Sequence, residues 1–215
     1  MKKIKNIILI GPQGCGKSTQ AGVISDYLKV AYLSMGNILR TAVKKKTNLG
    51  KKIEPIINSG RMISDEIAID IVKDALLESE YKNGFILDGF PRNIVQAEAM
   101  DKYIKIDKVF EIEISDKVAI ERISGRRICP NKHVWHIKFR PSKIKDKCDI
   151  CNQELYQRKD DTAEALKTRL NLYRKYTSKL LEYYSKQGKL VIFDGEKNIE
   201  EISKDLFNYL KKHAR

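Results

Sequence analysis

Short apolar runs alternate along the chain with segments in which apolar residues recur every three or four positions. The runs predict strands at 6–10, 30–33, 84–87, 108–114 and 189–193. The helical spacing predicts helices at 17–29, 66–77, 116–123, 163–184 and 199–210. Strands that alternate with helices form βαβ units, whose right-handed crossovers build a parallel sheet covered on both faces. The pattern therefore predicts an α/β fold with a five-stranded parallel sheet flanked by helices.

Two segments interrupt this alternation. Residues 35–61 are polar and helical in character, with glycine and proline as punctuation, and residues 125–159 hold three of the four cysteines. Both are predicted to be insertions into the core rather than parts of the sheet. The predicted division is a core of 1–34, 64–124 and 161–215, a helical insertion at 35–63 and a small second insertion at 125–160.

A glycine-rich motif joins the first predicted strand to the first predicted helix. It reads Gly11-x-x-x-x-Gly16-Lys17-Ser18, the pattern of a P-loop. The glycines let backbone N–H groups converge on phosphate oxygens, the lysine reaches the outer phosphates, and the serine hydroxyl is placed to contact Mg²⁺. A strand before and a helix after are the context that this motif requires. The chain is therefore predicted to bind a nucleoside triphosphate.

Composition narrows the class of protein. The chain has 215 residues, which suits one domain of ordinary size, and no apolar run approaches the roughly 20 residues of a membrane span. The formal net charge is +14, but 31 of the 42 basic residues are lysines spread over predicted helix faces. Such a spread is typical of a solvated surface rather than of a nucleic-acid interface. Without a signal peptide or a span, we expect a cytoplasmic protein that binds neither membrane nor nucleic acid.

The cysteines outside the P-loop predict a metal site. Cys129, Cys148 and Cys151 fall within 23 residues, as one half of a C-x3-H pair and as a C-x2-C pair. In a reducing compartment such clustering favours Zn²⁺ over disulfides, and four protein ligands would make the zinc structural. His133 is the expected fourth ligand, with His136 and Asp149 as alternatives.

A carboxylate ends the third predicted strand. Asp88 follows the run Gly84–Leu87 and is itself followed by Gly89-Phe90-Pro91-Arg92. In a P-loop protein, an aspartate at the end of a neighbouring strand is the usual partner of Mg²⁺, directly or through water. Asp88 is therefore expected to face the P-loop.

These motifs, in order from end to end, resemble those of adenylate kinases of the long-lid type. The matching stretches are 11–20, 33–40, 59–66, 83–92 with Gln96, 122–127 and 157–161. The resemblance implies reversible transfer of the γ-phosphoryl group from ATP, with Mg²⁺, to AMP, giving two ADP. It also implies that 35–63 binds the nucleoside monophosphate, that 125–160 is a zinc-bearing lid, and that the partners are ATP, AMP and ADP. We expect a monomer.

The resemblance also implies the roles of individual residues. The expected ATP-binding residues are Gly14, Cys15, Gly16, Lys17, Ser18, Thr19, Arg122, Arg126, Val134, Trp135 and Lys197. The expected AMP-binding residues are Met35, Arg40, Arg61, Met62, Ile63, Gly89, Phe90, Pro91, Arg92, Gln96, Arg158 and Arg169. The expected catalytic residues are Lys17, Asp88, Arg92, Arg126, Arg158 and Arg169.

The chain departs from the family pattern at three positions. Met35 stands where threonine is common and Asn37 where aspartate is usual. In zinc-bearing lids of the family the second ligand is usually a cysteine, at the offset that Lys132 occupies here.

Two other functions compete with this interpretation. A UMP/CMP or GMP kinase is the nearest, and Gln96, expected to read the adenine edge, argues against it. A nucleotide-dependent nucleic-acid-binding protein with a zinc module would use the basic surface, but it leaves Asp88–Arg92 unexplained. Formation of ADP from ATP and AMP distinguishes these functions.

Overall fold

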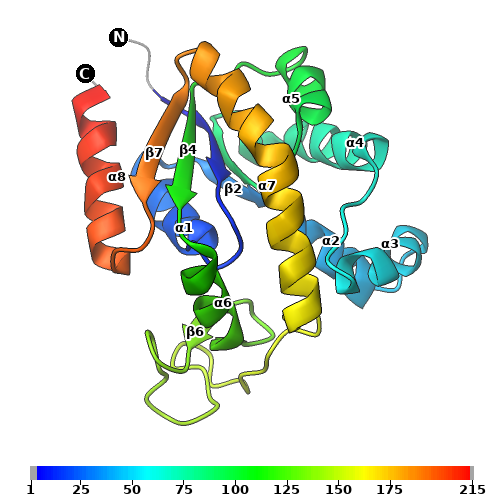
Figure 1. The fold of residues 1–215 in the computed structure, drawn as a ribbon, viewed down its shortest axis with the longest axis vertical. Coiled ribbons are helices and arrows are strands. Elements are labelled where there is room, and N and C mark those ends of the chain that lie inside the picture. Colours follow the sequence, from blue (N-terminus) through cyan, green and yellow to red (C-terminus); the bar gives the residue numbers. More distant parts are fainter. Residues whose placement is uncertain (1–3, 214–215) are drawn as a thin grey trace.

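The computed structural model describes residues 4–213, and its centre is a parallel five-stranded sheet (Figure 1). The strands are β1 (Asn6–Ile10), β2 (Ala31–Ser34), β3 (Phe85–Asp88), β4 (Lys108–Glu113) and β7 (Leu190–Asp194). They lie in the order β2-β3-β1-β4-β7, and every pairing is parallel. The predicted fold class is confirmed, and each predicted strand lies within one residue of an observed one.

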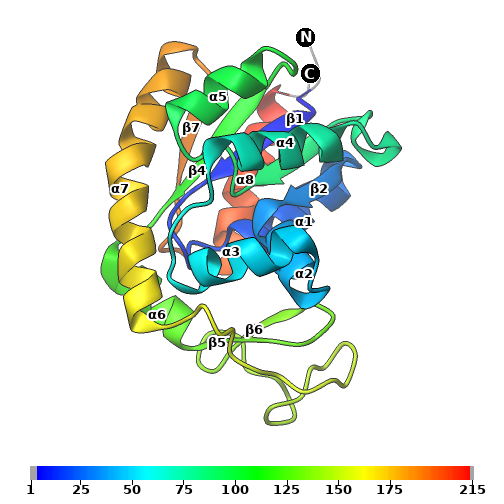
Figure 2. The ribbon, with the colours of Figure 1, turned by 90° about the vertical axis from the view of Figure 1, so that its right-hand side faces the viewer.

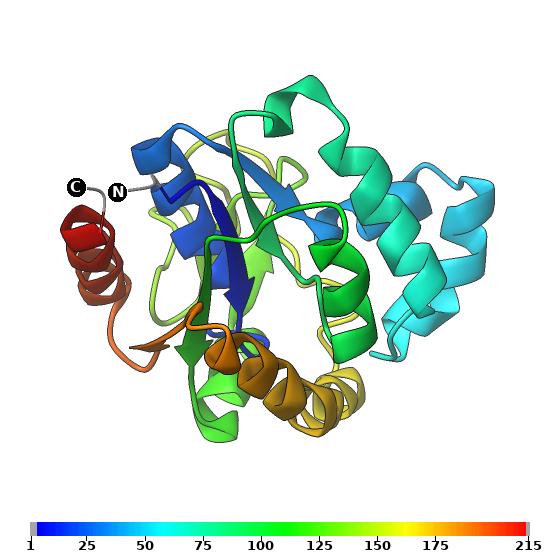
Figure 3. The same cartoon turned by 90° about the horizontal axis from the view of Figure 1, so that it is seen from above.

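Helices cover both faces of the sheet, as Figures 1 and 3 show. One face packs against α1 (Lys17–Leu28) and α8 (Ile199–His213), and the other packs mainly against α4 (Asp65–Leu76), α5 (Ile94–Asp101) and α7 (Ala163–Lys186). Strand β1 shows why both faces are apolar. Ile7 and Leu9 point to the face covered by α1 and α8, and Ile8 and Ile10 point to the face covered by α4, α5 and α7. Residues 7–10 of this strand are all buried, and they form a continuous apolar run after the half-buried Asn6.

The first insertion consists of two packed helices, α2 (Met35–Lys44) and α3 (Asn48–Asn58). The Thr47 side chain accepts from the Gly50 N–H and so caps α3. A Cβ at Gly50 would lie 2.1 Å from the carbonyl oxygen of Ala42, so glycine lets the two helices approach this closely. The 3₁₀-helix η1 (Ser79–Tyr81) lies in the connection between α4 and β3.

The second insertion follows α6 (Asp116–Ser124) and contains no helix between residues 125 and 160. Its short antiparallel hairpin consists of β5 (Arg126–Ile128) and β6 (Val134–His136), and isolated bridges such as Ile128 to Tyr156 tie the remaining loops to it. This insertion, which we call the lid for its expected role, lies below α6 and beneath α2 and α3 in Figure 2. Among the described residues, no helix has both the length and the apolar character that a membrane span needs.

Candidate active site

The loop after β1 is shaped to receive an anion. Gly14 and Gly16 have φ angles of 85° and 94°, which favour glycine, and a Cβ at Gly16 would meet nothing within 4 Å. Helix α1 begins at Lys17 with no side-chain cap and no acidic residue in its first turn. Its first N–H groups therefore remain available to phosphate oxygens, and the helix dipole favours negative charge there.

Lys17 lies folded over this loop. Its Nζ donates to the carbonyl oxygens of Gly11 at 2.6 Å and Pro12 at 2.9 Å, and lies 3.4 Å from the Cys15 sulfur. Burial raises the pKa of the Cys15 thiol, which keeps that side chain neutral and apolar in its packing. Ser18 is exposed at the start of α1, and Thr19 is half-buried one residue later.

Asp88 ends β3 directly beside the P-loop strand. The sheet register pairs it with Leu9, two residues before Gly11. The hydroxyl of Tyr32 donates to Asp88 Oδ2 at 3.1 Å, and burial together with the Asp88 charge raises the pKa of Tyr32. The tyrosine thus stays a donor and holds the carboxylate in place.

Arginines from separate elements converge next to these groups. They are Arg40 of α2, Arg92 after β3, Arg126 of β5, Arg158 of the lid and Arg169 of α7. Desolvation lowers the pKa of Arg92, and the charges of Arg169 and Arg40 lower it further. The pKa of Arg158 is lowered in the same way, first by burial and then by Arg126 and Arg40. The Nε of Arg158 is buried with no hydrogen-bond partner, so the cluster has unused capacity for an anion.

Two aspartates hold part of this cluster in place. Asp161 accepts from Arg126 Nε at 3.0 Å and Nη2 at 2.5 Å. Asp160 accepts from Arg169 at 2.6 Å and lies 3.9 Å from Arg40. Desolvation raises the pKa of Asp160, but its arginine neighbours outweigh this effect, so the net shift is downward. Five guanidinium groups face two paired carboxylates, which leaves an excess of positive charge.

The segment after Asp88 builds a second, adjoining corner of the site. Arg92 Nε donates to the carbonyl oxygen of Gly89 at 3.0 Å, and the Arg92 backbone N–H donates to Gln96 Oε1 at 2.8 Å. Phe90 and Pro91 are buried, and Met35 packs so closely that a Cβ at Gly89 would lie 3.4 Å from its own Cβ.

Asn37 and Arg61 of the first insertion each form a hydrogen bond with another residue of that insertion. Asn37 Oδ1 accepts from Arg40 at 3.2 Å, so the amide replaces in part the carboxylate usual at that position. Arg61 is exposed and its Nε donates to Ser59 at 3.0 Å, while Met62 and Ile63 are half-buried.

Arg122 ties the lid base to the loop after β7. Its guanidinium donates to the carbonyl oxygens of Gly195 at 2.7 Å and of Glu196 and Lys197 at 3.3 Å. The Lys197 side chain is directed to Asp205, at 2.8 Å, so its backbone rather than its ammonium group is held against Arg122.

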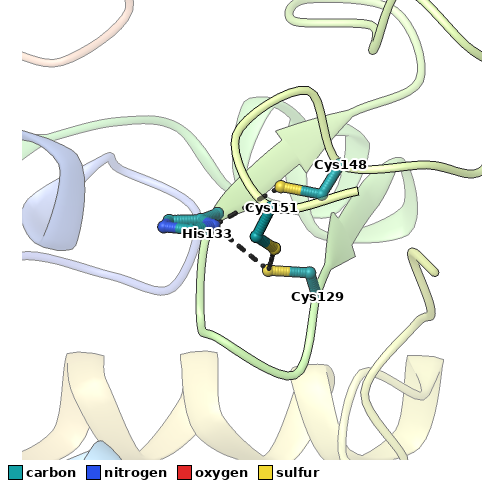
Figure 4. Close-up of side chains that lie close together, drawn as sticks. All are labelled: Cys129, His133, Cys148 and Cys151. Atoms are coloured by element: carbon teal, nitrogen blue, oxygen red, sulfur yellow. Dashed lines mark hydrogen bonds between the residues drawn. The ribbon is translucent and has the colours of Figure 1, made fainter. Parts of the chain in front are cut away.

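The three lid cysteines and one histidine come together in a single cluster (Figure 4). The ligand atoms of Cys129, His133, Cys148 and Cys151 all lie within 4.8 Å of one another. His133 Nδ1 lies 3.3 Å from the Cys129 sulfur and 3.4 Å from the Cys148 sulfur. Tetrahedral zinc–thiolate sites place their sulfurs about 3.8 Å apart, as follows from bond lengths of about 2.3 Å. The four groups therefore fit one tetrahedral ion.

The alternatives for the fourth ligand are engaged elsewhere. His136 Nδ1 accepts from the N–H groups of Lys138 and Phe139, each at 3.0 Å. The Asp149 carboxylate accepts from the Lys143 N–H at 3.0 Å. His133 is thus the residue that the structure brings to the cysteines.

Trp135 lies against this cluster as well. It is buried, and its Nε1 donates to the Cys148 sulfur at 3.3 Å. Arg140 stacks over its ring at 4.8 Å. The ring therefore packs in the lid interior, whereas the neighbouring Val134 is only half-buried.

Comparison with known proteins settles the family. A family model described as adenylate kinase matches residues 9–189. The chain belongs to the adenylate kinase family. An adenylate kinase of Caldicellulosiruptor bescii is 45% identical over 210 residues, covering 95% of this chain and 98% of its own. An adenylate kinase of Methanocella arvoryzae is 44% identical, and the match covers 96% of this chain and 99% of its own. An adenylate kinase of Francisella philomiragia is 40% identical, and the match covers 95% of this chain and 99% of its own.

Sequence reasoning about the adenylate kinase motifs missed four residues that the structure places at the site. Tyr32 holds Asp88, Asp160 and Asp161 hold the arginines, and Asp65 accepts from Gln96. Asp160 and Asp161 stand two and three residues after Arg158, within the matched stretch 157–161, so their charge could have been noticed. Asp65 lies in the matched stretch 59–66 but was given no role, and Tyr32 gave no signal, because their partners lie 31 and 56 residues away along the chain.

Proposed function

We propose that this chain catalyses reversible, Mg²⁺-dependent transfer of the γ-phosphoryl group of ATP to AMP, which yields two ADP and balances the adenine nucleotides. The observation that carries the proposal is the cluster of five arginines beside the P-loop and Asp88. It supports transfer between two phosphate chains because such a reaction must bring two polyanions into contact. A single nucleotide would need fewer cations.

The chemistry asks for positioning and charge rather than for a base. The acceptor is a phosphate oxygen that is already ionised at neutral pH, so no side chain has to remove a proton. Guanidinium groups fixed in place stabilise the charge that spreads over the transferring group. Arginine suits this role because its planar fork binds phosphate bidentately and stays charged.

The donor would bind on the P-loop side. We assign the phosphates of ATP to residues 14–19. The Lys17 side chain would leave its present contacts with the carbonyl oxygens of Gly11 and Pro12 to reach them. Arg122 and Arg126 would contact ATP at the lid base, with Val134 and the loop at Lys197 near the base or ribose. Trp135 was expected there too, and its burial against Cys148 favours a supporting role instead.

The acceptor would bind between α2 and the segment after β3. Arg40 and Arg92 would grip the AMP phosphate, and Gln96 would read the adenine. Met35, Arg61, Met62, Ile63 and residues 89–91 would line this side. Arg158 and Arg169 would bridge the two phosphate chains, and the unpartnered Nε of Arg158 fits that task.

Mg²⁺ would be held by the nucleotide phosphates, Ser18 and Asp88, where it would offset negative charge on the transferring group. The carboxylate of Asp88 and the exposed hydroxyl of Ser18 are hard oxygen donors, as this ion requires. The hydrogen bond from Tyr32 leaves the other carboxylate oxygen of Asp88 available to the ion or to its water.

Zinc in the lid would be structural. Three thiolates and one imidazole complete a tetrahedral shell, so no position is left open for substrate or water. Reduced thiols also fit the cytoplasm, where we expect the protein. The insertions 35–63 and 125–160 would then move as covers over AMP and ATP around the core.

A panel of acceptors tests the proposal. ATP with Mg²⁺ is offered with AMP, CMP, UMP and GMP in turn, and formation of ADP and of the acceptor's diphosphate is followed. We expect AMP to be phosphorylated fastest. If CMP or UMP is turned over faster than AMP at equal concentration, the acceptor assignment is wrong.

A further inference from the structure

The side-chain amide of Gln96 is buried and has partners of opposite character. Gln96 is 2% exposed. Its Oε1 accepts from the Arg92 backbone N–H at 2.8 Å, and its Nε2 donates to Asp65 Oδ1 at 2.7 Å. A backbone N–H can only donate and an ionised carboxylate can only accept. A rotated amide would place its NH₂ group against the N–H and its oxygen against the carboxylate, so only one orientation is permitted.

Asp65 is itself held in place for this contact. It is the first residue of α4, and its Oδ1 also accepts from Asn93 Nδ2 at 2.8 Å. Asn93 in turn caps α5, because its Oδ1 accepts from the Gln96 backbone N–H at 2.9 Å. Asp65, Asn93 and Gln96 thus form a closed ring of hydrogen bonds between α4 and α5.

The fixed amide leaves a fixed pattern for a ligand. An amide oxygen accepts two hydrogen bonds and an NH₂ group donates two, so each end of Gln96 retains one further capacity. Adenine presents an amino donor at C6 next to a ring-nitrogen acceptor. A 6-oxopurine presents an oxygen acceptor at C6 next to an N1–H donor, which needs the amide turned round. A freely rotating glutamine would serve both bases.

We infer that Asp65 is a specificity-determining residue of the acceptor site: by fixing the Gln96 amide, it selects a 6-aminopurine nucleotide over a 6-oxopurine nucleotide. This inference rests on the proposed function, since it takes the residues around Gln96 as the acceptor site. Asp65 itself acts through Gln96 and need not touch the substrate.

IMP is the probe that isolates this effect, because hypoxanthine differs from adenine only at the edge concerned. We expect kcat/KM of the parent protein to be about tenfold to a hundredfold higher for AMP than for IMP, which is the discrimination that one bidentate contact gives. Asp65→Asn replaces the obligatory acceptor with a group that can also donate, and Asp65→Ser is too short to reach Gln96. In both variants we expect the AMP to IMP ratio to fall by about tenfold, with kcat/KM for AMP lowered and that for IMP unchanged or raised.

Glu66→Gln is the matched control. Glu66 is the next residue of the same helix turn, carries the same charge and is exposed. Its loss changes the charge near the α4 N-terminus by the same amount and should leave the AMP to IMP ratio at the parental value.

The same ratio is measured by calorimetry of AMP and IMP binding without ATP, so the inference is tested even if turnover is absent. A parent that binds AMP and IMP equally overturns it. So do Asp65 variants that keep the parental ratio, or that lose affinity for AMP and IMP by the same factor, since a purely structural role predicts such parallel loss. Absence of transfer to AMP by the parent would instead contradict the proposed function, while the binding ratio would still decide the role of Asp65.

Discussion

At the scale of single residues, the site is defined by cations that lack full compensation. Asp160 and Asp161 pair with three of the five arginines, and Arg158 keeps a buried Nε without a partner. A buried cation without a full set of partners raises the free energy of the ligand-free protein, and bound phosphate supplies the missing partner. The cluster is therefore organised in advance for negative charge.

Lys17→Met and Arg92→Ala should each lower kcat by about a hundredfold or more while the protein stays folded. Each removes a cation from the place where two phosphate chains meet. Steady-state kinetics and a thermal melt check this. Lys82→Met, at an exposed lysine, is the control and should behave like the parent. Near-normal turnover in folded Arg92→Ala would contradict the acceptor-site assignment.

Glu111 leads to a separate prediction, which concerns how the stability of the fold depends on pH. It is buried in β4 and accepts from the Tyr173 hydroxyl at 3.0 Å, and burial raises its pKa. An acid whose folded pKa is raised stabilises the fold fully below its unfolded pKa, and this contribution is lost as pH rises through the folded pKa. Glu111→Gln cannot ionise, so it should melt above the parent at pH 7, and the difference should shrink towards pH 4. A difference between the two that is independent of pH would contradict the prediction.

At the scale of elements, the five strands and the long helices could be predicted from periodicity, because buried parallel strands are continuous apolar runs. Helix α5 was missed because it has only eight residues, of which just Ala97 and Met100 are buried apolar side chains. The β5-β6 hairpin was missed because strands of three residues carry no readable period.

The candidate site shows the same division. Spacing predicted that Cys129, His133, Cys148 and Cys151 come together, because the C-x3-H pair and the C-x2-C pair are each local in sequence. The orientation of Gln96 could not be predicted, since it depends on a contact between residues 31 positions apart.

The zinc lid should depend on its metal for order. Residues 125–160 contain few buried apolar side chains, chiefly Ile128, Trp135 and the ligands Cys129 and Cys148. Chelation should lower the melting temperature, while activity at low temperature survives in part. Elemental analysis should find about one Zn²⁺ per chain in the parent and in His136→Gln, but less in Cys148→Ser. Metal lost from His136→Gln and kept in Cys148→Ser would contradict the ligand set.

Trp135 should strengthen zinc binding through its hydrogen bond to the Cys148 sulfur, without contacting the metal. Its N–H donates to the Cys148 sulfur, and loss of such a contact commonly lowers metal affinity by about 10–100-fold. Trp135→Phe keeps most of the ring and removes the donor. Competition with a chromogenic chelator measures the affinity, and Phe139→Leu, at an exposed lid aromatic, serves as control. Equal zinc affinity in Trp135→Phe and the parent would show that this contact does not matter.

At the scale of the whole molecule, the two insertions lie next to each other beside the carboxyl ends of the strands (Figure 2). Arg40 of α2 and Asp160 at the end of the lid already approach within 3.9 Å. We expect 35–61 and 125–159 to close over AMP and ATP and exclude water from the γ-phosphate.

A bisubstrate analogue that joins the two nucleotides tests this closure. It should slow hydrogen exchange in both insertions, while AMP alone should affect mainly 35–61. The β4-β7 core should exchange equally slowly in every state and serves as the internal reference. Unchanged exchange in both insertions would count against closure.

The most direct test of the central claim uses ADP as the only nucleotide. Transfer between two ADP molecules must produce ATP and AMP in equal amounts, and no other substrate is present to account for them. Phosphorus NMR of the purified protein with ADP and Mg²⁺ should show both products rising together to equilibrium, and Arg92→Ala should slow this by about a hundredfold. Inorganic phosphate as the main product, or unchanged ADP with a folded protein, would contradict the assignment of this chain as an ATP:AMP phosphotransferase.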